Sequence, residues 1–249
     1  MKRLAHHLES LYLGARHPRA AWLRLTRSID LRIASQLEDF AGAGYFKDVT
    51  DIYDIGANVG LFAEAYAALI RGVKVTCFEP VPATFELLKH RCGEIPGVRM
   101  ERLALGDQSS VLKMNTCTLD QADSLLMPGQ ELVGGWEGVS PNGQVDVNVV
   151  TLDDYVEQHP SSGMASLKID VQGYELKVLR GATKTLAQCR SVQVEVSIME
   201  MYKGAPLFPE VWTFLRSHGF ELAEIFGLLR SPTHGLPVSC DFLFVNRKT

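Results

Sequence analysis

A glycine-containing turn and an acidic residue about twenty positions later are the features most suggestive of chemistry. Residues 54–62 read Asp-Ile-Gly-Ala-Asn-Val-Gly-Leu-Phe, and Glu79 follows a second apolar run. Glycine at position 56 permits a tight turn and close approach of the backbone to a ligand, and Asn58 tolerates left-handed conformations. A carboxylate at the end of the next strand can accept hydrogen bonds from ribose hydroxyls. The two features together predict an adenosine-containing ligand.

Two common nucleotide motifs are missing from this turn. The dinucleotide fingerprint GxGxxG is not met, because Asn58 and Leu61 stand at its second and third glycine positions. The chain also lacks the GKS or GKT ending of a phosphate-binding loop. These absences weigh against a nucleotide-dependent oxidoreductase, which we keep as a less favoured alternative.

Two further carboxylates, Asp170 and Glu195, are the candidate catalytic residues. Asp170 ends the run Ser-Leu-Lys-Ile-Asp, and Glu195 lies in an apolar strand pattern, where an acid is costly unless it is paired or faces a polar cleft. The pair could share a proton and provide a general base. It could instead bind a divalent metal ion, but no third ligand is evident, so we favour a site without metal. Gln172 cannot act as a base.

Three residues are candidates for contact with a substrate. Trp136 lies in a glycine-rich stretch and could stack on a sugar ring or anchor its loop. Tyr202 and His234 fall in segments expected to surround the same crevice.

The elements that must position these residues alternate between strand and helix patterns from about residue 49 onward. This alternation is typical of an α/β fold with a mainly parallel sheet covered on both faces, in which ligands bind beyond the carboxyl ends of the strands. Strands are predicted at 51–55, 73–78, 98–103, 166–170, 191–197, 221–226 and 241–246, and helices at 60–71, 82–92, 174–188 and 207–218. Residues 106–164 interrupt the rhythm and are interpreted as an inserted hairpin or lid, with strand fragments at 110–114 and 145–151.

The N-terminal residues 1–47 are predicted to form a helical extension. Within residues 1–32, seven basic and two acidic side chains give a charge of +5, which leaves −9 for the rest of a chain of net charge −4. Apolar residues recur every three or four positions, as in amphipathic helices. The extension could pack on the main domain, make a weak peripheral contact with a membrane, or form a homodimer.

Composition narrows the class of protein further. The chain has 249 residues, of which 46% are hydrophobic, so it can bury a sizeable core. A negative net charge disfavours a nucleic-acid-binding protein. The five cysteines form no CxxC pair, no apolar run reaches membrane-spanning length, and we find no signal peptide, so we expect a cytoplasmic protein with reduced thiols.

Several blocks, taken in order, resemble one known family. They are DIGANVGLF, CFEPVPATFELLKH, LALGDQSS, TLDDYV, LKIDVQGYELKVLRGA, VEVS and CDFLFV, and they span approximately residues 50–246. The chain is identified as a member of the FkbM-type family of S-adenosylmethionine-dependent methyltransferases. The resemblance implies a class I methyltransferase fold, Rossmann-like, with a seven-stranded mixed sheet, over residues 48–249.

The resemblance also implies a set of residues that bind S-adenosylmethionine. The turn would surround the methionine part, Asp54 would help to hold its amino group, Glu79 the ribose, and residues after the second and third strands the adenine. The implied cofactor-binding residues are Asp54, Gly56, Asn58, Gly60, Glu79, Pro80, Ala104, Leu105 and Asp107. Asp107 could equally cap a turn, and the family often has glutamate where this chain has Gln172.

The expected function is therefore O-methylation of a hydroxyl on a sugar-bearing or polyketide-type metabolite, a small-molecule or glycan substrate. The main alternative is a non-catalytic module that keeps the methyltransferase fold for binding or assembly. Gln172 keeps that alternative open, whereas Asp54 and Glu79 argue against it.

Overall fold

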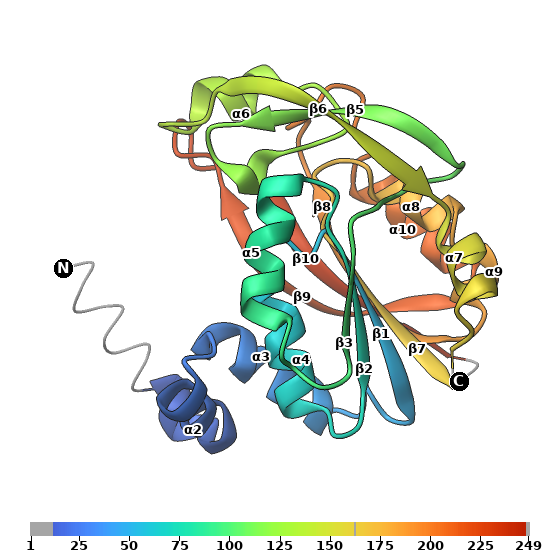
Figure 1. The fold of residues 1–249 in the computed structure, drawn as a ribbon. Helices are drawn as coiled ribbons and strands as arrows, with labels where there is room; N and C mark the ends of the chain where they lie inside the picture. Colours follow the sequence, from blue (N-terminus) through green and yellow to red (C-terminus); the bar gives the residue numbers. More distant parts are fainter. Residues whose placement is uncertain (1–11, 162, 248–249) are drawn as a thin grey trace.

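A seven-stranded sheet forms the centre of the computed structural model, which describes residues 12–161 and 163–247 (Figure 1). The strand order is β3-β2-β1-β7-β8-β10-β9, with β10 antiparallel to both of its neighbours. The strands are β1 (Val49–Ile55), β2 (Lys74–Phe78), β3 (Val98–Glu101), β7 (Met164–Ile169), β8 (Cys189–Ser197), β9 (Phe220–Arg230) and β10 (Pro237–Asn246). The predicted class I methyltransferase fold, with a seven-stranded mixed sheet, is confirmed.

Helices cover both faces of this sheet, as predicted. One face carries α4 (Leu61–Leu69) and α5 (Pro82–Cys92), and the other carries α7 (Leu152–Gln158), α8 (Glu175–Arg180), α9 (Thr183–Leu186) and α10 (Phe208–Ser217). Successive residues of a strand point to opposite faces. Ile52 of β1 accordingly packs in the core beneath α4 and α5, whereas Tyr53 packs in the core on the opposite face, beneath α7 to α10. Burial on both faces explains why β1 is apolar almost throughout.

A smaller sheet lies over the carboxyl-terminal edge of the main one. It consists of β4 (Ala104–Leu105), β6 (Pro141–Val150) and β5 (Ser110–Cys117), in that order. The connection between β5 and β6 contains a 3₁₀ turn, η1 (Asp120–Ala122), and helix α6 (Gln130–Gly135). We call residues 106–150 the cover segment, because they lie across the end of the sheet where the parallel strands stop (Figure 1).

Several predicted elements differ in extent from those observed. The strands β9 and β10 are longer than the predicted 221–226 and 241–246, and two other elements are interrupted or end early. The helix predicted at 174–188 is divided into α8 and α9 at Gly181, where a β-carbon would stand 1.9 Å from the carbonyl oxygen of Gly106. The strand predicted at 98–103 ends at Glu101, because Ala104 and Leu105 leave the main sheet and pair with β6. Both departures follow from contacts with the cover segment or with the chain leading into it.

The N-terminal region contributes α2 (Pro18–Arg27) and α3 (Leu31–Gly42). Leu37 and Phe40 of α3 share a core with β1 and α4, so this helix packs on the main domain. The predicted apolar and basic positions before residue 12 lie outside the described residues. In the part of the chain that the structure describes, no helix has both the length and the apolar character needed to cross a membrane.

Candidate active site

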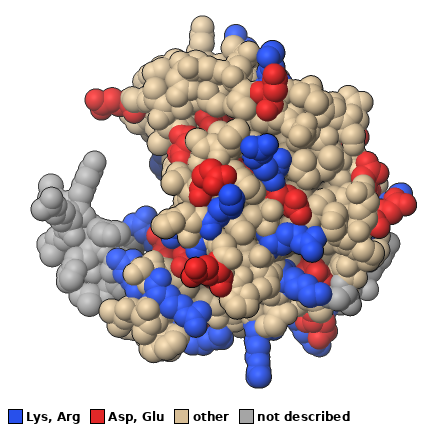
Figure 2. Space-filling view, in the orientation of Figure 1, with Lys and Arg blue, Asp and Glu red and all other residues tan. Residues whose placement is uncertain are grey.

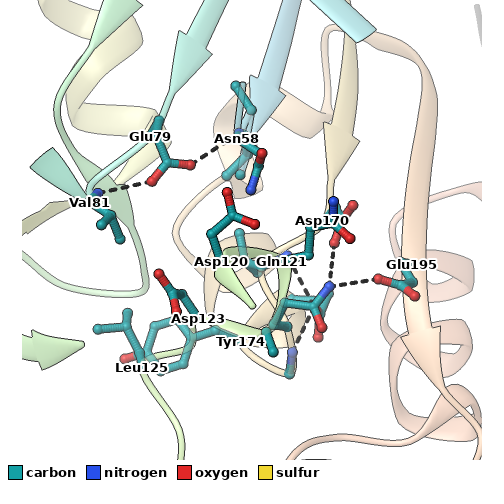
Figure 3. Close-up of a pocket in the computed structure, with 18 of the residues that line it drawn as sticks. Asn58, Glu79, Val81, Asp120, Gln121, Asp123, Leu125, Asp170, Tyr174 and Glu195 are labelled. Carbon is teal, nitrogen blue, oxygen red and sulfur yellow. Dashed lines mark hydrogen bonds between the residues drawn. The ribbon is translucent and has the colours of Figure 1, made fainter. Parts of the chain in front are cut away.

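A cavity of about 600 Å³ lies between the carboxyl ends of the parallel strands and the cover segment. Gly56, Asn58, Glu79, Asp170 and Glu195 all line it, although they follow or end four different strands. Figure 3 shows Asn58, Glu79, Asp170 and Glu195 around one hollow. The topology explains the convergence, because parallel neighbours end at the same edge of the sheet.

The turn after β1 packs closely against the backbone at the end of the neighbouring strand β7. Gly56 has φ +77°, and a β-carbon there would stand 1.9 Å from the backbone oxygen of Asp170. Only glycine fits such a position without movement of the backbone. Asn58 also has a positive φ, of 48°, and its Oδ1 accepts a hydrogen bond of 2.7 Å from the Val59 amide.

Glu79 is clamped by backbone amides. Its Oε2 accepts a hydrogen bond of 3.0 Å from the Asn58 amide, and its Oε1 accepts one of 2.9 Å from the Val81 amide (Figure 3). Burial raises the pKa of Glu79 to about 7, while the two amides oppose the shift. A carboxylate offers about four lone-pair directions, so Glu79 retains acceptor capacity toward the cavity.

Lys168 was not singled out from the sequence, and it is the centre of the charge arrangement. This buried side chain lies in β7, with Nζ 3.5 Å from Oδ1 of Asp54 and 3.3 Å from Oδ2 of Asp170. Its Nζ also donates to the Gly56 carbonyl at 3.3 Å and lies 4.9 Å from the centre of the Phe62 ring. Although burial alone would lower it, the Lys168 pKa is raised by Asp170 and Asp54.

The two candidate catalytic carboxylates are joined by an amide. Gln172 Nε2 donates to Asp170 Oδ1 at 2.7 Å and to Glu195 Oε2 at 2.9 Å. The Gln172 Oε1 accepts a hydrogen bond of 3.0 Å from the Tyr202 hydroxyl, and Ser239 Oγ donates to Glu195 Oε1 at 2.9 Å. Every polar atom of the Gln172 side chain is therefore engaged inside the site.

The pKa values of these two carboxyls are displaced in opposite directions. Burial opposes ionisation of Asp170, but Lys168 and the Gln172 amide together lower its pKa. Burial raises the pKa of Glu195 well above its ordinary value, and the negative charge of Asp170 raises it further. Of the two carboxyls, Asp170 is consequently the one that ionises more readily.

The structure brings most of the predicted site residues to this cavity. The lining includes Gly56, Asn58, Glu79, Pro80, Ala104, Leu105, Trp136, Asp170, Glu195 and Tyr202. Their individual roles remain predictions.

Four predicted residues are not in the lining. Asp54 is fully buried and is linked to the site through Lys168. Gly60 precedes the first turn of α4 and packs against α5. Asp107 pairs with Lys177 at 2.7 Å, and His234 pairs with Glu131 at 3.1 Å.

Sequence reasoning also missed Asp120 and Asp123, which the cover segment brings to the cavity. Asp123 accepts a hydrogen bond of 2.7 Å from the Cys117 amide, and burial raises its pKa to about 6. Both lie in an irregular stretch with no periodic signal. Lys168 did carry a signal, since a lysine inside an apolar strand requires a buried partner.

The residues present fit S-adenosylmethionine, which the family resemblance implies. The cavity has the size of a cofactor site. Glu79 has spare acceptor capacity that ribose hydroxyls could use, and the apolar Phe78, Val81 and Leu105 also line the cavity. Within residues 12–161 and 163–247, no group of three or more His, Cys, Asp or Glu side chains is arranged to hold a metal ion.

Comparison with known proteins gives the family. A family model described as "Methyltransferase FkbM domain" matches residues 54–222, which is more than half of the chain. The 2-O-methyltransferase NoeI of Sinorhizobium fredii is 26% identical over 160 residues, or 61% of this chain and 65% of NoeI, just under two thirds of that protein. The hexuronic acid methyltransferase AglP of Haloferax volcanii is 29% identical over 180 residues, or 70% of each chain.

A third relative is the 31-O-demethyl-FK506 methyltransferase FkbM of Streptomyces tacrolimicus, 28% identical over 199 residues, or 68% of this chain and 72% of that protein. Among solved structures, Aeropyrum pernix fibrillarin with bound S-adenosyl-L-methionine aligns with a TM-score of 0.43 and 12% identity, over 83% of this chain and 74% of that one. At this level the structural similarity does not bear on function. The match of the family model shows that the chain belongs to the FkbM family of S-adenosylmethionine-dependent methyltransferases.

Proposed function

We propose that this chain transfers the methyl group of S-adenosylmethionine to a hydroxyl of a sugar-bearing or polyketide-type metabolite. The observation that carries the proposal is the single cavity lined by Asn58, Glu79 and Asp170 in a chain of this family. The relatives support the acceptor class, because their names specify 2-O-methylation, a hexuronic acid and an FK506 derivative.

The cofactor end of the site would be formed by the turn after β1 and by the end of β2. Glu79, held by two backbone amides, would accept hydrogen bonds from the ribose hydroxyls. The backbone of residues 56–58 would lie along the methionine part. When bound, the cofactor supplies a methyl group on a positively charged sulfur, which is already electrophilic.

The acceptor end would be formed by Asp170, Gln172 and Glu195. Asp170 is ionised and can accept the proton of the attacking hydroxyl, which leaves the oxygen as the methyl ether. The Gln172 amide fixes the direction of both carboxylates. Correct alignment can contribute roughly 7–11 kcal/mol, so we expect positioning by these residues to matter at least as much as proton removal.

Two measurements test this proposal. Calorimetry should detect binding of S-adenosylhomocysteine, and absence of binding to folded protein would rule out the cofactor. Incubation with methyl-labelled cofactor and an extract of the source organism, followed by mass spectrometry, should reveal a labelled product with a new O-methyl group. Asp170→Asn should keep cofactor binding but reduce labelling, and unchanged labelling would remove Asp170 from the mechanism.

We also propose a weak peripheral membrane contact through α2. Trp22 and Leu25 are 57% and 85% exposed and lie beside Arg24 and Arg27 on this helix. Apolar and basic side chains exposed together are typical of helices that rest on anionic lipid surfaces. Lys and Arg side chains lie over this region in Figure 2.

Co-sedimentation tests the membrane contact. Binding to vesicles containing phosphatidylserine should exceed binding to pure phosphatidylcholine vesicles and should fall in Trp22→Ser/Leu25→Ser; equal binding in all arms would contradict the contact. A homodimer and a cytoplasmic location stay predictions.

A further inference from the structure

The cavity extends beyond the residues proposed to bind the cofactor. The lining of this further part indicates which acceptor molecules fit there. Six of the described lining residues are acidic: Glu79, Asp120, Asp123, Asp170, Glu175 and Glu195. Among the described residues, Lys168 is the one basic side chain in the lining. Acidic groups thus outnumber basic groups in the described wall of the cavity.

Lys168 is not free to receive an anionic substrate. Its Nζ lies within 3.5 Å of Asp54 and 3.3 Å of Asp170, and the side chain is buried. Burial raises the pKa of Glu79 and Glu175 to about 7 and that of Asp123 to about 6, and it raises the pKa of Glu195 well above its ordinary value. Part of the negative charge of the wall is therefore neutralised already near neutral pH. Protonation removes negative charge but creates no basic group, so a carboxylate on the acceptor would still have no free cationic partner among the described lining side chains.

The cover segment adds an apolar part to the wall of the cavity. Met114, Leu125, Leu132, Trp136 and Val139 belong to that segment and line the cavity. These side chains offer an acceptor a large hydrophobic contact and few hydrogen bonds.

The apolar wall continues to the rim. Leu119 and Leu229 also line the cavity, yet they are 43% and 40% exposed. They come from the cover segment and from β9, two elements far apart in the sequence. A bound acceptor that extends out of the cavity with an apolar body would cover both.

From this lining, and resting on the proposed function, we infer that the acceptor is an uncharged molecule whose reacting hydroxyl is carried on an apolar body. Asp170 and Glu195 receive the hydroxyl end, and the cover segment contacts the apolar body. Anionic acceptors such as hexuronates are disfavoured, because no free basic side chain in the described lining can pair with their carboxylate. This separates the chain from its relative AglP, which is named for a hexuronic acid.

Two fluorescent probes with the same ring system test the inference. N-phenyl-1-naphthylamine is neutral, whereas 1-anilinonaphthalene-8-sulfonate carries one negative charge on the same skeleton. Each is titrated into the full chain saturated with S-adenosylhomocysteine, and energy transfer from tryptophan is recorded. We expect the neutral probe to bind at least ten times more tightly than the anionic one.

Matched variants show where the probe binds. The chain has three tryptophans, at positions 22, 136 and 212, and of these Trp136 alone lines the cavity. Trp136→Phe should remove most of the energy transfer to the neutral probe, whereas Trp22→Phe and Trp212→Phe should not. The double variant Asp120→Asn/Asp123→Asn should reduce the difference in binding affinity between the neutral and the anionic probe.

The outcomes are distinct. Equal affinity for the two probes would overturn the selection against anions, and failure of the neutral probe to bind would overturn the apolar contact. Energy transfer that survives Trp136→Phe would also overturn the inference, because the probe would then bind elsewhere. Failure of S-adenosylhomocysteine to bind in a separate calorimetric titration would instead refute the proposed function.

Discussion

Replacement of Lys168 by methionine should destabilise the protein strongly at neutral pH and less in mild acid. The methionine keeps the length of the side chain but removes the charge that lies 3.5 Å from Asp54 and 3.3 Å from Asp170. Asp54 is fully buried, and neither of its carboxylate oxygens has a hydrogen-bond partner within the described structure. The variant therefore leaves a buried carboxylate without its counter-charge.

The expected loss of stability depends on whether Asp54 stays ionised or takes up a proton. Keeping an unpaired buried charge costs about 3–5 kcal/mol. The carboxyl can instead take up a proton, which costs about 1.36 kcal/mol for each pH unit above its ordinary pKa of 3.8. Protonation thus limits the part of the loss that comes from Asp54 to about 4 kcal/mol at pH 7 and to about 2 kcal/mol at pH 5.5.

The direction of the pH dependence is defined by proton binding. Burial already raises the pKa of Asp54 in the folded protein, and loss of Lys168 removes the charge that opposes this shift. The folded state then holds a proton that the unfolded state has released, so the stability of the variant falls as pH rises above the ordinary carboxyl pKa.

Urea denaturation followed by circular dichroism at pH 5.5 and pH 7 measures both values. Asp54→Asn is the single control, and Lys168→Met/Asp54→Asn should recover most of the stability at pH 7 because it removes the orphaned charge. An equal loss at both pH values, or a double variant no more stable than Lys168→Met, would refute the reasoning. If Lys168→Met does not fold at pH 7, a double variant that does fold still supports the reasoning.

Three further predictions concern the site. Gly56→Ala should lower the melting temperature even without ligand, because the new β-carbon would collide with the backbone of Asp170. The loss should exceed that of Gly72→Ala, since Gly72 has a similar φ of +76° but nothing within 4 Å of the added β-carbon. Equal losses would show that the strain of a positive φ accounts for the whole effect. Affinity for S-adenosylhomocysteine in calorimetry should fall up to about tenfold per pH unit below pH 7, because Glu79 must be ionised to accept the ribose hydroxyls; a flat profile, identical to that of Glu79→Gln, would contradict this role. Gln172→Leu removes two hydrogen bonds to carboxyls, each worth about 1.5–3 kcal/mol to a charged partner. It should lower kcat and shift its pH profile with little change in cofactor affinity, whereas a changed KM alone would indicate a purely structural role.

The sequence predicted the main sheet well because its signals are local. Apolar runs followed by glycine or an acid mark the strand ends, and their alternation with helical patterns predicts the parallel sheet. The break between α8 and α9 has a different origin. It depends on the close approach of Gly181 to Gly106, two residues far apart in the chain, and helical periodicity contains no information about that contact.

The site was predictable to the extent that it follows from strand ends. Asn58, Glu79, Asp170 and Glu195 meet because parallel strands finish at one edge. The role of Lys168 depends instead on register, since Lys168 of β7 lies opposite Asp54 of β1 in the pairing of the two strands. A one-residue shift would turn its side chain to the other face. The sequence does not specify the register, so this ion pair appears only in the structure.

The contacts of Gln172 answer the main argument against a catalytic function for this chain, which is that the family often has glutamate at this position. Considered alone, an amide where the family often has an acid suggests a lost catalytic group. In the structure both amide hydrogens are used, one toward Asp170 and one toward Glu195. A third carboxylate between these two acids would add repulsion that Lys168, already paired with Asp54 and Asp170, could not offset. The glutamine instead holds both carboxyls in fixed directions, as positioning of the proposed acceptor hydroxyl requires.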